Sequence, residues 1–243
     1  MLENLITHTD PQIIHAPGFD KSKPKVWWQI INKYQKLKPS RKADCEIITF
    51  NNKTKSLCEK SLDVKNLNYH TLGKNIKNWN NLYKFELSKN FCSDKKNKIC
   101  IGLDSFDVIF IGDLQVCLDR FLPMNKKLVY NAEIKFYPDC QDKYFQECKF
   151  SQEAKNKDHK FKFLNSGAWI GYADFCEFFF DECSKIKLWE DYNITFPLIK
   201  NSEQSVLHKM VEKYNDYVDL DKNCKIFQNL AHITNEVWLP IRY

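Results

Sequence analysis

Apolar and polar positions along the chain predict short strands that alternate with helices. Residues 45–50 are rich in side chains that suit a pleated sheet, and residues 98–103 form the most continuous apolar run. Such a run is typical of a strand that is buried on both faces of a sheet. Apolar residues at helical spacing predict helices over residues 79–90, 175–186 and 203–214. The alternation predicts an α/β fold with helices on both faces of the sheet.

Shorter patterns complete the predicted order of elements. A strand over residues 5–9 precedes a turn that contains Pro and Gly, and a helix over residues 26–37 follows. Residues 135–160 are polar and predict an elaborated loop. With only 6 Gly and 8 Pro the chain has little room for a flexible linker, so we expect one domain over residues 1–243. The further predicted strands are residues 68–72, 108–111 and 128–132, and residues 163–172 predict a strand or a hairpin interrupted by Asn165-Ser166-Gly167.

The charge balance favours an ordinary solvated surface. The chain has 37 basic and 31 acidic residues, and its lysines are scattered rather than gathered into a stripe. Since a nucleic-acid footprint needs clustered positive charge, we expect no nucleic-acid partner. No apolar run reaches the roughly 18 residues of a membrane span, so none is expected. Residues 1–10 lack the basic and apolar regions of a signal peptide, which predicts a cytoplasmic location.

The 10 cysteines show no metal-binding or redox spacing. No Cys-x-x-Cys pair is present, which argues against a zinc ribbon and a thioredoxin-type centre. Several cysteines lie in apolar stretches, where a thiol packs as a small hydrophobic group. Cys140 and Cys148 are close enough in sequence to bridge, but spacing alone does not establish the geometry of a disulfide. We therefore expect reduced thiols.

The chemically informative motif is Leu103-Asp104-Ser105-Phe106-Asp107. Its two carboxylates directly follow the predicted buried strand, at the carboxyl edge of the sheet, where α/β proteins bind ligands. Oxygen ligands there suit Mg²⁺ or Mn²⁺, above all when a substrate supplies phosphate oxygens. The spacing alone is weak evidence, because a capping or turn pair gives the same pattern. The motif resembles the Asp-x-Asp pattern of glycosyltransferases that use sugar nucleotides. Its position directly after the apolar run strengthens this interpretation.

Four strings of residues carry a more specific resemblance. In order and approximate spacing, from about residue 5 to residue 230, they resemble the glycosyltransferase domain of the multifunctional procollagen lysyl hydroxylases. The combination of Phe-Leu-Asn-Ser-Gly with Phe-Gln-Asn-Leu is the specific part of the match. The strings are residues 103–110, Tyr130-Asn131-Ala132-Glu133, Phe163-Leu164-Asn165-Ser166-Gly167-Ala168-Trp169-Ile170-Gly171-Tyr172-Ala173 and Lys225-Ile226-Phe227-Gln228-Asn229-Leu230.

The resemblance implies a GT-A-like fold that binds a UDP-sugar and Mn²⁺. It implies transfer of a hexose, with glucose as the leading sugar, to hydroxylysine-linked galactose of collagen or a collagen-like protein. Related collagen galactosyltransferases add the preceding galactose, so galactosylation of hydroxylysine stays open. A catalytically weak or inactive domain that binds a sugar nucleotide or a glycan is another alternative. A nucleotidyltransferase is disfavoured because the sequence has no Gly-rich phosphate loop.

The same resemblance assigns residues to the donor side of the site. Asp104 and Asp107 match the ligands of the metal and the diphosphate. Phe106 matches an aromatic position near the uridine, where the family usually has Tyr, so a hydroxyl contact is lost. Thr9 and Lys84 match positions near the nucleotide, although an ordinary surface lysine is the alternative interpretation of Lys84.

Glu133, Asn165 and Glu203 match catalytic positions around the transferred sugar and the acceptor. Tyr137 stands where the family commonly has Trp. Glu203 lies in Asn201-Ser202-Glu203-Gln204, where the family has an Asp-rich stretch that ends in Asp-Gln, so this segment is less acidic. The structural alternatives are a solvated carboxylate at a strand end for Glu133 and a turn-forming amide for Asn165.

The sequence departs from the family at the third metal ligand. The family has a histidine there, in a His-Gly-Asn-Gly segment beyond the Phe-Gln-Asn string, and this sequence shows no such segment up to Tyr243. His232 follows the string too closely to be its equivalent. Two carboxylates, phosphate and water suffice chemically, because Mg²⁺ and Mn²⁺ often keep waters. A truncated or degenerate relative of the family is the alternative.

The abundance of Lys and Asn bears on the source of the chain. It fits a viral or microbial relative that modifies collagen-like repeats. For a viral protein we expect the host cytoplasm or a viral factory as the location. A homodimer stays open.

Overall fold

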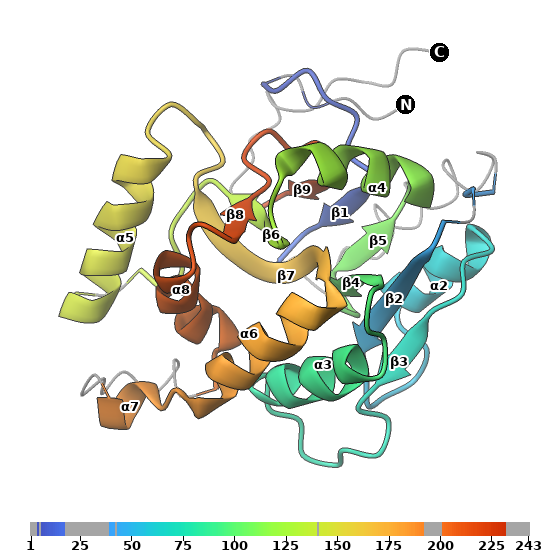
Figure 1. Cartoon of the computed structure of the whole chain (residues 1–243), viewed down its shortest axis with the longest axis horizontal. Helices are drawn as coiled ribbons and strands as arrows, with labels where there is room; N and C mark the ends of the chain where they lie inside the picture. Colours follow the sequence, from blue (N-terminus) through green and yellow to red (C-terminus); the bar gives the residue numbers. More distant parts are fainter. Residues whose placement is uncertain are drawn as a thin grey trace.

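A six-stranded sheet forms the centre of the part of the chain that the computed structural model describes, which is residues 4, 6–17, 39–41, 43–139, 141–191 and 201–231 (Figure 1). Its spatial order is β3 (His70–Leu72), β2 (Cys45–Phe50), β4 (Ile99–Leu103), β7 (Phe163–Tyr172), β6 (Leu128–Glu133) and β8 (Val218–Leu220). Strands β3, β2 and β4 are parallel, whereas β7 lies antiparallel between β4 and β6. The carboxyl ends of β2 and β4 therefore meet at one edge of the sheet.

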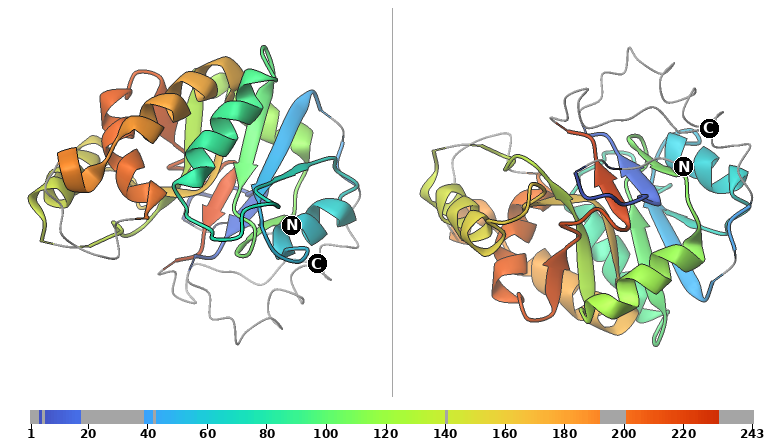
Figure 2. Two further views of the ribbon diagram at one scale, coloured as in Figure 1. Left: turned by 90° about the horizontal axis from the view of Figure 1, so that it is seen from below. Right: turned by 90° about the horizontal axis from the view of Figure 1, so that it is seen from above.

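A smaller sheet joins the two ends of the sequence. Its order is β5 (Val108–Phe110), β1 (Ile13–His15) and β9 (Phe227–Asn229). Strand β1 is antiparallel to β5 and parallel to β9, and Figure 2 shows the blue β1 beside the red β9. Apolar side chains of all three strands share one core with the central sheet. This core fixes β1 next to the loop that follows β4.

Helices cover both faces of the central sheet, which confirms the predicted α/β fold. Neighbouring strand residues supply the two cores alternately, as Ile47 and Ile48 do in β2 and Cys100 and Ile101 in β4. This is the burial expected of strands covered on both faces. A short 3₁₀ helix, η1 (Leu122–Met124), and α7 (Leu188–Asp191) complete the described elements. One face carries α3 (Tyr83–Ser93), α5 (Lys143–Lys155), α6 (Ala173–Lys185) and α8 (Glu203–Lys213), and the other α2 (Leu57–Val64) and α4 (Leu114–Phe121).

Side-chain caps set where the helices near the site begin. Ser56 and Glu59 form a capping box at the start of α2, each bonded to the backbone of the other. The hydroxyl of Ser202 accepts a hydrogen bond from the backbone N–H of Ser205, which fixes the start of α8. Glu203 is therefore the first residue of α8, at the end that faces the central sheet.

The prediction of a loop over residues 135–160 is wrong, because α5 occupies half of it. Asp142 caps this helix, and Tyr144, Phe145 and Cys148 turn inward to the core. The other positions are so polar that the inward face is hard to see in the sequence. An apolar face only a few residues wide was sufficient to dock the helix.

The first predicted strand is also misplaced. Residues 6–8 form a turn, with an isolated bridge between Asn4 and Thr9, and the strand itself is β1 at Ile13–His15. The predicted helix over residues 26–37 lies outside the described residues. Residues 163–172 form one strand rather than a hairpin, because the pairing of β6 with β7 shifts between Tyr130 and Asn131 and leaves a bulge. The other predicted strands and helices are present with small changes of boundary.

Two further expectations concern the membrane and the thiols. None of the helices within the described ranges has the length and apolar character needed to cross a membrane. The cysteines that the structure describes are unpaired thiols, and all but Cys45 are buried. Cys140 lies outside the described residues, so the pair Cys140–Cys148 is not placed.

Candidate functional site

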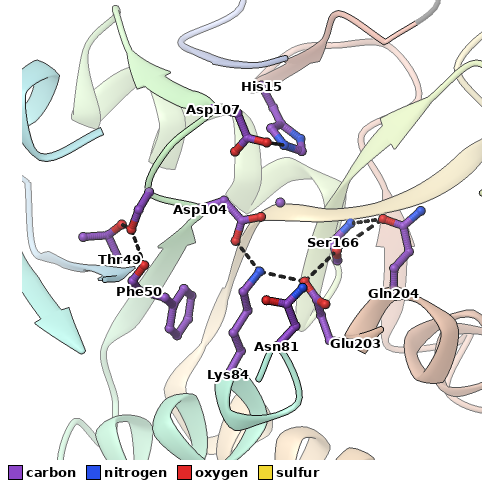
Figure 3. Close-up of polar contacts among 12 residues, drawn as sticks. His15, Thr49, Phe50, Asn81, Lys84, Asp104, Asp107, Ser166, Glu203 and Gln204 are labelled. Atoms are coloured by element: carbon purple, nitrogen blue, oxygen red, sulfur yellow. Dashed lines mark hydrogen bonds and ion pairs between the residues drawn. The ribbon is translucent and has the colours of Figure 1, made fainter. Parts of the chain in front are cut away.

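The loop after β4 presents two carboxylates at the edge of the sheet. Ser105 anchors it, since its hydroxyl lies 3.0 Å from that of Thr49 and also bonds the carbonyl of Phe50. The backbone N–H of Asp104 donates to the carbonyl of Gly167 at 2.8 Å, which ties the loop to β7. With Ser105 turned into the protein, the side chains of Asp104 and Asp107 are left to face the cleft (Figure 3).

A cleft of about 290 Å³ opens beside this loop. Its walls combine two acidic groups with lysines and aromatic rings, a composition that suits a charged ligand with a flat ring. Phe106 is 54% exposed at its margin, and the ammonium of Lys53 lies 5.8 Å from the ring centre. The lining residues are Phe50, Asn52, Lys53, Trp79, Asn81, Lys84, Asp104, Ser105, Phe106 and Asp107.

His15 joins the two aspartates from strand β1. One ligand atom from each of His15, Asp104 and Asp107 lies within 4.8 Å of the others. The backbone N–H of Ala16 donates to the carbonyl of Asp107 at 2.8 Å, which holds the end of β1 against the loop. Gly167 makes room for the ring, because a Cβ there would lie 2.1 Å from Cε1 of His15. Three segments of the chain thus converge on one small volume.

The residues in this volume shift the pKa values of one another. Burial alone would lower the pKa of His15, but the carboxylate of Asp107 outweighs it and the pKa is raised. Burial raises the pKa of Asp104 to about 6, with Lys84 opposing the shift and the charge of Asp107 adding to it. The pKa of Asp107 is lowered, because His15 outweighs the effect of burial. The carboxylates of Asp104 and Asp107 repel each other and are only partly neutralised by Lys84 and His15. Their remaining negative charge favours the binding of another cation.

These residues fit a divalent metal ion. Two carboxylates and an imidazole are donors that Mn²⁺ accepts. Nε2 of His15 is buried and has no hydrogen-bond partner within the described part of the chain. One ligand atom of each of the three side chains lies within 4.8 Å of the others, so these residues would be able to hold one ion after their side chains draw together. The donor set, with Nε2 of His15 beside the carboxylate of Asp107, therefore passes the test for such an ion.

Lys84 lies between the aspartate loop and helix α8. Its Nζ donates to Oδ1 of Asp104 at 2.5 Å and to Oε1 of Glu203 at 2.6 Å. Burial alone would lower the pKa of Lys84, but the two carboxylates outweigh burial and raise it. An ordinary surface lysine would be solvated, whereas the side chain of Lys84 is only 12% exposed and its ammonium pairs with two carboxylates of the site.

A hydrogen-bonded network continues from Glu203 on the far side of Lys84. The hydroxyl of Ser166 donates to Oε1 of Glu203 at 3.2 Å, and its backbone N–H donates to Oε1 of Gln204 at 3.1 Å. Nε2 of Gln204 donates to Oε1 of Glu133 at 2.8 Å, and Nδ2 of Asn165 donates to Oε2 of the same carboxylate at 3.3 Å. The structure thus brings together the three residues that the sequence assigned to the acceptor side.

Glu133 is buried rather than solvated, so its solvent-exposed alternative is wrong. Burial raises its pKa to about 7, although the hydrogen bonds from Gln204 and Asn165 oppose the shift. Asn165 does more than form a turn, because it connects Glu133 to His15 across β7. A carboxyl group with this pKa changes protonation near neutral pH.

Thr9 does not lie with the other predicted residues. Its hydroxyl donates to the carbonyl of Cys224 at 2.9 Å, and Thr9 does not line the cleft. The residues at the end of β2 stand by the cleft instead, with Phe50 and Asn52 in its wall. The displacement follows from the misplaced first strand, because β2 occupies the place in the central sheet that residues 5–9 were expected to take.

The sequence did not single out His15. The signal that was available is a short apolar pair, Ile13-Ile14, followed by histidine and a Pro-Gly turn, and this is too brief to stand out. Another histidine, His208, is structural: it is fully buried, its Nε2 lies 2.8 Å from the carbonyl of Tyr137, and burial lowers its pKa to about 4. The side chain of Tyr137 is exposed at the margin of the network.

Most of the residues of this site lie within a segment that is similar to known proteins. The PLOD GT domain matches residues 49–242. The chain is 30% identical over 148 residues to procollagen-lysine,2-oxoglutarate 5-dioxygenase 1 of Bos taurus, covering 60% of this chain and 18% of that protein. It is 27% identical over 147 residues to uncharacterized protein R699 of Acanthamoeba polyphaga mimivirus, covering 60% of this chain and 28% of that protein. The chain thus spans less than a third of the curated relatives it matches, one of which is viral.

Proposed function

Because this chain belongs to the PLOD GT domain family, a family of glycosyltransferase domains, we propose that it transfers a hexose from a UDP-sugar with a divalent metal ion, Mn²⁺ first among candidates. Glucose is the proposed sugar, and the proposed acceptor is galactose on hydroxylysine of a collagen-like protein. The name of the bovine relative, which refers to procollagen lysine, supports that class of acceptor. The family match includes every predicted site residue except Thr9.

The observation that carries the proposal is the convergence of Asp104, Asp107 and Lys84 on one cleft with aromatic walls. A nucleoside diphosphate has a flat base at one end and a concentrated negative charge at the other. Phe106 and Trp79 offer rings for the base. The ammonium of Lys84 is fixed by two carboxylates, so its charge needs little reorganisation to face a diphosphate.

Asp104 and Asp107 are the residues that would hold the ion. When bound, the ion would supply charge to neutralise the diphosphate leaving group and would orient it. The protein contributes the fixed position of the two carboxylates, because Ser105 and Gly167 anchor the loop that carries them.

Glu203 and Glu133 serve the sugar and the acceptor in this proposal. The resemblance implies that transfer retains the configuration at the anomeric carbon, so no base on the opposite face of the sugar is required. Glu203, held by Lys84 and Ser166, can then stabilise the positive charge that develops on the sugar. Glu133 and Asn165 keep the wall behind it in place and offer polar atoms toward the acceptor.

A transfer assay tests the proposal directly. A galactosyl-hydroxylysine peptide is incubated with UDP-glucose and Mn²⁺, and mass spectrometry should show a gain of one hexose that EDTA abolishes. Transfer from UDP-galactose to bare hydroxylysine would replace the proposed substrates and keep the reaction class. Binding of UDP-glucose without transfer or hydrolysis would favour a binding domain and contradict the enzyme.

A further inference from the structure

We propose that His15 is the third protein ligand of the metal ion and that it enters the site from the N-terminal side of the sequence. This inference rests on the proposed function for the presence of the ion. The two aspartates come from the loop after β4, within the family match, whereas His15 precedes the matched residues 49–242.

The position of His15 suits a ligand better than a packing residue. Its Nε2 lies 3.4 Å from Oδ2 of Asp107, and the residue is only 3% exposed. No hydrogen bond to this nitrogen exists among the described residues. A buried imidazole nitrogen this close to a carboxylate oxygen is satisfied either by its own proton, as an ion pair, or by a cation that both groups bind. Figure 3 shows the imidazole facing Asp107, with Asp104 below.

The hydrogen bonds around Asn165 assign the tautomer of His15. The backbone N–H of Gly167 donates to Oδ1 of Asn165 at 3.0 Å, so this atom is the amide oxygen. Nδ1 of His15 lies 2.7 Å from the same oxygen and therefore carries a proton. In the neutral ring the lone pair is then on Nε2, directed at the carboxylate of Asp107. This is the arrangement of metal-bound histidines, whose second nitrogen donates to a neighbouring oxygen.

The small sheet makes this ligand available at the right place. β1 lies between β5 and β9, and β9 contains the Phe-Gln-Asn residues. The backbone N–H of Leu230 donates to the carbonyl of His15 at 2.7 Å, so the histidine lies beside the end of that string. Strand β1 thus places His15 beside the Phe-Gln-Asn residues of β9, although the two strands lie far apart in the sequence. The small sheet thus supplies a histidine donor from outside the residues that match the family.

The charges around the ion site agree with this donor set. Asp104, Asp107 and Glu203 contribute three negative charges, and Lys84 returns one positive charge. With neutral His15 the group has an excess of two negative charges, which one divalent ion balances. The alternative is a positively charged His15 that pairs with Asp107 and binds no metal.

Manganese binding separates these two roles. Electron paramagnetic resonance measures free Mn²⁺ during titration of the wild-type protein, His15→Gln and His208→Gln, with and without UDP. His208 is the matched control, because it is equally buried and bonded to Gln152 and Tyr137 instead of the aspartates. We expect His15→Gln to weaken Mn²⁺ binding at least tenfold and His208→Gln to change it less than threefold. Equal affinity of His15→Gln and wild type, or no Mn²⁺ binding by wild type, would overturn the proposal.

Pulsed electron paramagnetic resonance of Mn²⁺-loaded protein keeps the test decisive if His15→Gln does not fold. We expect coupling to an imidazole nitrogen in the wild type and in His232→Gln, which removes the histidine outside the described residues. Its absence from the wild type, or its loss in His232→Gln, contradicts the assignment. Mn²⁺ coupling without hexose transfer would refute the proposed function and leave His15 as a ligand. Mn²⁺-dependent hexose transfer that persists in His15→Gln would support the proposed function and refute the role of His15 as a ligand.

Discussion

Lys84 lies between two groups of polar residues, the one around Glu133 and the one around Asp107. These two sides differ in whether their polar atoms have hydrogen-bond partners. On the side of Glu133, both carboxylate oxygens accept hydrogen bonds, and the amide of Gln204 uses its oxygen and its nitrogen. On the side of Asp107, the nearest nitrogen of His15 has no hydrogen-bond partner in the described structure. The first side is complete without a ligand, whereas the second has charge and donor atoms in excess.

This difference separates two tasks that a transferase site must perform. A wall of satisfied hydrogen bonds keeps its geometry when substrates come and go, because no group has to change partner. A group of metal-binding side chains with excess negative charge is stabilised when a cation binds. Lys84 connects both sides through Asp104 and Glu203, so each side limits the movement of the other.

The largest expected effect comes from removing a carboxylate on the side of Asp107. Asp104→Asn keeps the size of the side chain and removes one charged ligand, so we expect metal-dependent UDP affinity to fall about a thousandfold, or about 4 kcal/mol. Calorimetric titration of UDP with and without Mn²⁺ measures this loss. Asp119→Asn, on the exposed surface of α4, is the control and should bind as the wild type does. Unchanged metal-dependent affinity of Asp104→Asn would remove this residue from the site.

The next effect concerns the satisfied side and its response to pH. Burial raises the pKa of Glu133 from 4.5 to about 7, so its contribution to stability is complete below about pH 4.5 and is lost as the pH rises through 7. The free energy of unfolding should therefore fall by about 3 kcal/mol between pH 4.5 and pH 8 on account of this residue. Glu133→Gln should remove that part of the slope. Urea unfolding at several pH values measures it, and an identical slope in the variant would mean that Glu133 does not titrate in this range.

Glu203→Gln tests the boundary between the two sides. The change removes the charge beside Lys84 and keeps the shape, so we expect the transfer rate to fall at least about tenfold, or roughly 1.4 kcal/mol of barrier, with UDP affinity nearly unchanged. Rates with UDP-glucose and the galactosyl-hydroxylysine peptide measure the effect. Glu212→Gln, on the same helix at the surface, is the matched control. Full activity of Glu203→Gln would refute its catalytic role and leave the substrates untouched.

The smallest expected effect is that of a reductant. Because the described cysteines are thiols, neither side of the site depends on a described disulfide. Addition of reductant should change the melting temperature by less than about 2 °C, whereas loss of a native bridge costs about 2–5 kcal/mol. Differential scanning calorimetry with and without reductant checks this. A larger drop would point first to Cys140 and Cys148.

Local patterns in the sequence were sufficient for part of the fold and the site. The apolar run that became β4 predicted both the buried strand and the place of Asp104 and Asp107 at its end. The motif around Asn165 was found as well, although its bulge was not, because a bulge depends on how β6 pairs with β7. Helix α5 was missed because its inward face is narrow among polar residues.

The part that could not be predicted is nonlocal. Three residues of β1 carry no clear strand signal of their own, and their pairing with β9 involves the opposite end of the sequence. The misplaced Thr9 and the overlooked His15 have this one cause. Similarity to a family points to motifs in their usual order, so before residue 49 it led to Thr9 and not to His15.

The pairing of β1 with β5 and β9 also has a consequence for synthesis. Strand β1 leaves the ribosome long before its partner β9, which ends at Asn229. At about 5–20 residues per second, roughly ten to forty seconds separate the two strands. Until then β1 has one edge without a hydrogen-bonding neighbour, and such edges attract other chains. That edge of β1 therefore stays open during synthesis, and His15 is secured beside the aspartates only after β9 has been translated.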